Sequence, residues 1–191
     1  MTALNTLVVR LSQSRKAVVL IAVAFGVAFL LLMLAASSFR SAVGGLEPFD
    51  LQNGLTPAEV REQLARYGDS ATGRYLAFTA VDWFFPLLGG LLTAVIAAAC
   101  LRNSFPQLYA RAVSWRLFAL FFLPTLFDWT ENVFALWLVL GGSPPSSTAV
   151  NGLLLAKQFK LFALVIVQTA TALAIAGWIV MALRRRIGQH R

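Results

Sequence analysis

Four long apolar runs limit this chain to a small set of folds. They cover about residues 17–39, 75–101, 112–140 and 153–183. A helix needs roughly 20 apolar residues to cross the hydrocarbon core of a bilayer, and each run is long enough to do so with some tilt. The runs predict an all-α, polytopic membrane protein. We expect residues 1–191 to form a single transmembrane domain, a four-transmembrane-helix bundle.

Composition agrees with a membrane class and excludes several kinds of site. Hydrophobic residues make up 59% of the chain and charged residues only 13%, whereas about a quarter of a soluble domain is charged. The lone Cys100 and the lone His190 support neither an internal disulfide nor a thiolate or histidine metal site. We therefore expect no metal and no cofactor, with His190 solvated and Cys100 packed.

The placement of charge predicts an orientation. Basic residues occupy three segments that contain no acid, whereas the extramembrane acids all fall in the loop 40–74. By the positive-inside rule, both termini are cytoplasmic and the loops 40–74 and 141–151 face outward. The basic residues are Arg10, Arg15, Lys16, Arg102, Arg111, Arg116, Arg184, Arg185, Arg186 and Arg191, and the acids are Glu47, Asp50, Glu59, Glu62 and Asp69.

These charges predict a multi-pass protein of the plasma (inner) membrane. The basic residues cluster at the ends of apolar runs and form no long arm, so the net charge of +8 does not indicate nucleic acid.

The basic start and the small residues after the first run also resemble a signal peptide. A retained helix is favoured because this apolar run exceeds the usual h-region of roughly 7–15 residues.

The first outer loop should contain a short amphipathic helix over residues 57–67. Thr56 suits an N-cap, Pro57 suits the first helical position, and Glu59 completes a capping box. We expect this helix to lie on the outer membrane surface or to cap the bundle. A plain surface helix and a lid over a site are the alternatives.

Polar side chains within three of the runs mark the candidate site. Charges at membrane depth are costly, so they face the bundle interior and have partners. On each of these runs, spacings of three and four residues place the polar groups on one helical face. We predict an acid and lysine cluster in the outer half of the bundle, with Arg74 and Tyr75 at its outer mouth. Its members are Asp82, Asp128, Glu131, Asn132, Lys157, Lys160 and Gln168.

The cluster has one more carboxylate than lysine. Three acids face two lysines, and a buried carboxylate without a partner is costly. A proton, a cation or a cationic ligand group would compensate, unless Arg74 does. Pro86 and Pro124 lie close to the acids and would free backbone carbonyls that can coordinate a cation or bind a polar ligand. Alternatively, these prolines only kink their helices.

Three functions fit this pattern, so whether the chain is an enzyme stays open. The first is binding or moving a small polar or lipid-derived ligand, or protons, with oligomerisation expected because four helices are few for a transporter. The second is an accessory or assembly subunit of a membrane complex, locked by structural ion pairs. The third is an intramembrane enzyme acting on a lipid head group, with Asp128 and Glu131 as acid and base. The expected partners are the lipid bilayer and a second copy or another membrane protein.

Two limited resemblances bear on the enzyme alternative. The span count is similar to that of the vitamin K epoxide reductase family, but the cysteine pairs of that family are missing. The Asp-x-x-Glu-Asn run at 128–132 resembles part of the Asp-x-x-Asp-Gly signature of CDP-alcohol phosphotransferases. The rest of that signature is absent, so neither resemblance assigns a family.

Overall fold

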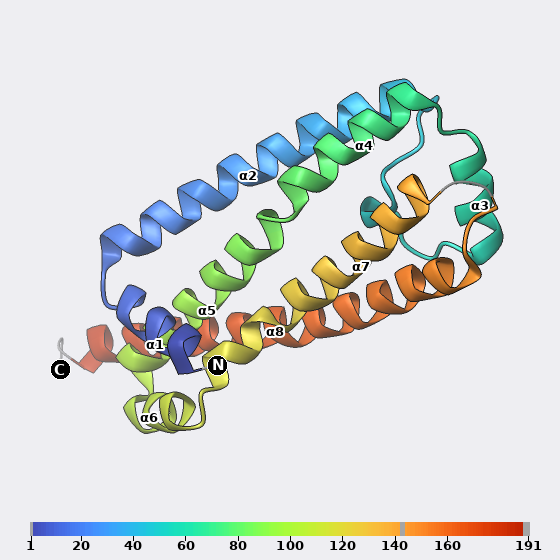
Figure 1. The fold of residues 1–191 in the computed structure, drawn as a ribbon. Coiled ribbons are helices and arrows are strands. Elements are labelled where there is room, and N and C mark those ends of the chain that lie inside the picture. Colours follow the sequence, from blue (N-terminus) through green and yellow to red (C-terminus); the bar gives the residue numbers. More distant parts are fainter. Residues whose placement is uncertain (1, 142–143, 189–191) are drawn as a thin grey trace. The chain divides into compact units, whose positions relative to one another are not determined.

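The computed structural model describes residues 2–141 and 144–188, and within these ranges the chain is helical and has no strand. This confirms the predicted all-α class. His190 lies outside the described residues. The elements, shown in Figure 1, are α1 (Thr2–Leu11), α2 (Arg15–Ala42), η1 (Phe49–Leu51), α3 (Pro57–Ala65), α4 (Asp69–Asp82), α5 (Phe85–Ser104), α6 (Pro106–Ser114), η2 (Leu117–Phe122), α7 (Leu123–Leu140) and α8 (Ser147–Gly188).

Three helical stretches are long and apolar enough to cross a membrane. They are Arg15–Ala42, the consecutive helices over Asp69–Ser104, and Ser147–Ile187. At about 1.5 Å per residue, the shortest of them, with 28 residues, exceeds the roughly 30 Å of a bilayer core. A fourth stretch qualifies if the bent pair Pro106–Ser114 and Leu117–Leu140 is counted as one span.

The bend in this fourth stretch differs from the third expected range. The axes of the two segments differ by 71°, and Arg116 between them adopts a left-handed conformation, with φ of 58°. Such a backbone is uncommon for a residue with a Cβ and interrupts a right-handed helix. The straight run that leads to Asp128 therefore begins at Leu117, and Ala112 belongs to α6.

A proline sets the end of α4. Pro86 has no amide hydrogen, and its ring clashes with the carbonyl of the residue four positions earlier, which is Asp82. The helix breaks at residues 83–84. Two side chains of α7 satisfy carbonyls at the break. The Trp129 indole donates to the Trp83 carbonyl at 2.9 Å, and the Thr125 hydroxyl donates to the Pro86 carbonyl at 2.8 Å.

The described chain divides into two compact units, and the second contains the predicted acids and lysines. This second unit comprises Phe25–Leu87 and Pro124–Phe162. Within it, α4 packs along the C-terminal part of α2 through Phe78, Leu32 and Ala36 (Figure 1).

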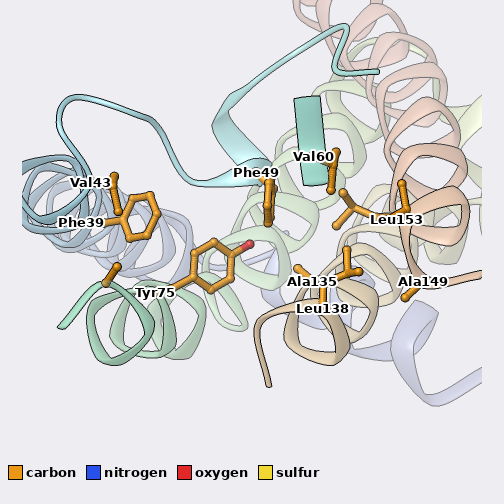
Figure 2. Close-up of a cluster of buried hydrophobic side chains, with 11 residues drawn as sticks. Phe39, Val43, Phe49, Val60, Tyr75, Ala135, Leu138, Ala149 and Leu153 are labelled. Carbon is orange, nitrogen blue, oxygen red and sulfur yellow. The ribbon is translucent and has the colours of Figure 1, made fainter. Parts of the chain in front are cut away.

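A large apolar cluster of the second unit joins its loop to α2, α4, α7 and α8. Phe39 of α2, Phe49 of η1 and Tyr75 of α4 meet Leu138 of α7 and Leu153 of α8 (Figure 2). The ring centroids of Phe39 and Tyr75 lie 5.4 Å apart in an edge-to-face arrangement. This apolar contact fixes the loop that carries Phe49 against the helices, so that the residue after it, Asp50, is held in place as well.

The helix in the loop 40–74 begins as predicted. The Thr56 hydroxyl accepts from the Glu59 amide, and the Glu59 carboxylate accepts from the Thr56 amide at 2.7 Å. The predicted capping box is therefore present. Val60 of α3 is fully buried in the apolar cluster of the second unit.

Close packing of α7 on α8 can be tested at Gly152. A Cβ at this position would lie 2.5 Å from ring carbons of Phe134. We expect Gly152→Ala to lower the free energy of unfolding by about 1–3 kcal/mol, the usual cost of overpacking. The measurement is detergent-solubilised thermal or SDS-driven unfolding.

Gly73→Ala in α4 is the matched control, because an added Cβ there has no neighbour within 4 Å. It should raise the free energy of unfolding by about 0.5–1 kcal/mol, since alanine favours a helix over glycine. Equal stability of the two variants would contradict the described packing of α7 on α8.

Candidate functional site

Lysines of α8 meet carboxylates of α7 in a buried cluster of the second unit. Lys157 Nζ lies 2.8 Å from Glu131 Oε1 and also donates to the backbone carbonyl of Phe49. The Glu131 side chain is fully buried, and that of Lys157 is 5% exposed. One charge of each sign and a carbonyl acceptor give this pair a locally balanced environment.

Lys160 contacts three carboxylates, one turn further along α8. Its Nζ lies 2.7 Å from Asp50 Oδ1, 2.9 Å from Asp128 Oδ1 and 2.6 Å from Glu131 Oε2. Lys157 and Lys160 are three residues apart, as are Asp128 and Glu131, so each pair lies on one helical face. The polar faces that the sequence predicts for α7 and α8 therefore point toward each other.

Asp82 joins the cluster through an amide and not through a lysine. Asn132 Nδ2 donates to Asp82 Oδ2 at 2.8 Å and lies 3.5 Å from Asp128 Oδ2. Asp82 is 3% exposed and Asn132 is fully buried. No basic side chain among the described residues forms an ion pair with Asp82. Its position at the end of α4 follows from the break before Pro86.

Asp50 is a member of the cluster that sequence reasoning missed. It was expected among the extramembrane acids of the outer loop, but its side chain is only 4% exposed and binds Lys160. The reason is the neighbouring Phe49, which is fully buried in the apolar cluster. The available signal was the aromatic Phe49 directly before the acid, with Leu46 and Leu51 close by in the sequence.

Three other predicted site residues form no hydrogen bond or ion pair with the cluster among the described residues. Arg74 donates to the Ser38 carbonyl and the Ser41 hydroxyl, both at 2.7 Å, so these contacts give it no role in balancing the cluster. Gln168 is exposed on α8 beyond the second unit. Tyr75 is fully buried, and its hydroxyl has no hydrogen-bond partner among the described residues.

The charge of the cluster is more unbalanced than the sequence indicated. Four carboxylates surround two lysines, which leaves a formal charge of −2. The excess lies with the aspartates. One oxygen from each of Asp50, Asp82 and Asp128 can be chosen so that all three lie within 4.8 Å of one another. Like charges this close in a buried site disfavour their joint ionisation unless positive charge binds there.

Oxygen ligands dominate this part of the cluster. Three carboxylates and the amide of Asn132 are hard ligands of the kind that Mg²⁺, Mn²⁺ and Ca²⁺ prefer. The cluster includes no cysteine or histidine among the described residues. We expected no metal because the sequence offers neither a thiolate nor a histidine site. That expectation did not take into account Asp50, the third aspartate, which comes from the loop.

Comparisons with known proteins give no family. No protein-family model, curated protein or solved structure matches this chain. The function must therefore be argued from the site.

The energetic coupling of the buried ion pair can be measured by a double-mutant cycle. We expect Glu131→Gln and Lys157→Met each to lower the free energy of unfolding by about 3–5 kcal/mol. Glu131→Gln leaves the buried Lys157 without a carboxylate, and Lys157→Met leaves Glu131 to Lys160 alone and raises the negative excess of the buried cluster. The double variant should cost less than the sum, with a coupling of about 1–3 kcal/mol. SDS-driven unfolding in mixed micelles measures all four proteins.

The same cycle at Glu62 and Arg66 of the loop 40–74 is the control. These side chains form an exposed pair four residues apart, for which about 0.3–0.5 kcal/mol is usual. If the coupling at Glu131 and Lys157 is no larger than this control value, the two charges do not share a buried site.

Proposed function

We propose that this chain is an integral protein of the plasma (inner) membrane, built as a four-span bundle with cytoplasmic termini. Three apolar helices and one bent pair support the span count. The acid-free basic segments support the orientation. In this proposal α3 is an amphipathic helix of the outer face, and the cluster lies in the outer half of the bundle.

Single cysteines test this topology in a Cys100→Ala background. Glu62 of α3 and Gln107 of α6 are both exposed. We expect Glu62→Cys to react with a membrane-impermeant maleimide on sealed, right-side-out vesicles. Gln107→Cys should react only after detergent is added, because the proposal places α6 on the cytoplasmic side. Labelling of both cysteines on sealed vesicles, or of Gln107→Cys alone, would overturn the orientation.

We further propose that the cluster binds positive charge. The ligand is a proton, a cation, or the cationic group of a small polar or lipid-derived molecule. The observation that carries this proposal is the excess of two carboxylates in a buried site. Desolvation of an uncompensated charge costs several kcal/mol, so the site is most stable when positive charge occupies it.

One observation favours a second function. The Lys157–Glu131 pair has no net charge, and Lys157 also donates to the Phe49 carbonyl. Such a pair can serve only to hold α7, α8 and the loop together. A bundle stabilised in this way would suit an accessory or assembly subunit of a membrane complex. This alternative explains Lys157 and Glu131, but it gives no reason for the three aspartates and their unbalanced charge.

Asp82→Asn separates the two functions, because Asp82 forms no ion pair that the change would break. If the cluster binds positive charge, wild type stripped of metal with EDTA should melt at a higher temperature at pH 5.5 than at pH 8.5, because protons are then the positive charge that neutralises the buried carboxylates. This difference should be smaller in Asp82→Asn, which should be at least as stable as wild type at pH 8.5. Detergent-solubilised thermal unfolding gives the melting temperatures, and mass spectrometry of extracts identifies co-purified molecules.

Asp69→Asn is the control, since Asp69 is an exposed acid of the same helix. It should retain the wild-type difference between the two pH values. Suppose instead that Asp82→Asn is destabilised equally at both pH values and nothing co-purifies with wild type. The cluster would then be structural, and the accessory-subunit function would be preferred.

A further inference from the structure

We infer that Asp50, Asp82 and Asp128 form a binding site for one hard divalent cation, of the Mg²⁺, Mn²⁺ or Ca²⁺ class. This inference rests on the proposed function, because it names the positive charge that the cluster binds. Four features of the cluster support it: the carboxylate oxygens that no lysine contacts, the spacing of the oxygens, the charge excess and a buried hydroxyl.

Each aspartate has an oxygen that no lysine occupies. Lys160 contacts Oδ1 of Asp50 and Oδ1 of Asp128. This leaves Oδ2 of both residues, of which Asp50 Oδ2 is buried without a hydrogen-bond partner among the described residues. Asn132 donates to Asp82 Oδ2, which leaves Oδ1 of Asp82. Lysine and amide thus orient the carboxylates and leave one oxygen of Asp50 and one of Asp82 free for a metal, while Asp128 Oδ2 has only a long contact of 3.5 Å with Asn132 Nδ2.

The spacing of the oxygens fits a single ion. Metal–oxygen distances run from about 2.0 Å for Mg²⁺ to about 2.6 Å for Ca²⁺, so two ligands of one ion lie at most roughly 4–5 Å apart. The three aspartates offer oxygens within 4.8 Å of one another. They come from η1, α4 and α7, so three separate segments converge on this point.

A divalent ion also balances the charge of the cluster. Four carboxylates and two lysines carry −2, and an ion of charge +2 makes the sum zero. A single proton or a monovalent cation would leave one buried charge uncompensated. Neutralising both charges with protons would require two aspartates to be protonated at once.

The Tyr75 hydroxyl is an independent indication of a ligand at this cluster. Tyr75 is fully buried and its hydroxyl has no partner among the described residues, although an unsatisfied buried polar group costs about 1–3 kcal/mol. Figure 2 shows the hydroxyl pointing away from Phe39. It lies within electrostatic reach of Asp50, Asp82 and Glu131. A water bound to the metal would give this hydroxyl its partner, because Mg²⁺ usually keeps several waters.

Mn²⁺ is the probe for this site, since its free aqueous form is counted directly by electron paramagnetic resonance. The purified full chain in detergent, first stripped with EDTA, should bind one Mn²⁺, and Mg²⁺ or Ca²⁺ should compete. In Asp82→Asn the dissociation constant should rise at least about tenfold, while Asp69→Asn should bind as wild type does. Asp50→Asn provides a second test if Asp82→Asn does not fold.

Hydrogen exchange of the loop gives a structural readout in addition to the dissociation constant. Asp50 belongs to η1, so an ion should tie this segment to α4 and α7, and Mn²⁺ should slow amide exchange across Phe49–Leu51 in wild type only. If wild type binds no stoichiometric Mn²⁺, or Asp82→Asn binds it equally well, the metal inference is wrong. The proposed function then survives only if the pH dependence of stability still requires Asp82, and it fails too if that dependence is unchanged in Asp82→Asn.

Discussion

The three contacts of Lys160 with carboxylates are the interaction on which the second unit depends. Its ammonium group meets the loop through Asp50 and α7 through Asp128 and Glu131. At short range in a poorly solvated site, each such attraction is strong, but it offsets the desolvation of the ions only if every partner is held in place. The positions of α7, α8 and η1 are therefore linked through one nitrogen atom.

The surrounding backbone explains how these groups come so close. α4 ends at Asp82 because Pro86, in the first turn of α5, prevents a continuous helix, and side chains of α7 bond to the carbonyls at the break between the two helices. Gly152 lets α8 approach Phe134 of α7, which brings the polar faces of the two helices into contact. A helix pair held further apart would leave the lysines short of the carboxylates, since hydrogen bonds weaken steeply with distance and misalignment.

The parts of the structure that depend on local periodicity could be predicted from the sequence. Spacings of three and four residues placed Asp128, Glu131 and Asn132 on one face, and the structure brings them together with Asp82, Lys157 and Lys160. The stripe on α8 was extended too far, because a shared helical face does not ensure a shared environment. Gln168 lies two turns beyond Lys160 and is exposed.

The contacts of the loop and the bend between α6 and η2 could not be predicted in this way. The bend at Arg116 follows no proline or glycine, so nothing in the local composition marked it. Asp50 entered the cluster because Phe49 packs into a tertiary apolar contact, and no periodicity relates a loop residue to a distant helix.

The contribution of the loop changes the chemistry of the site as well as its membership. Without Asp50, three carboxylates and two lysines leave one negative charge, which a single proton can neutralise. With Asp50, the excess is two, and it is concentrated on three aspartates whose oxygens lie within 4.8 Å. A divalent ion matches this arrangement better than one proton does, because it removes both charges and attracts all three carboxylates at once. The occupant of the cluster is thus coupled to the position of a loop, since moving Asp50 away would return the site to the charge that one proton satisfies.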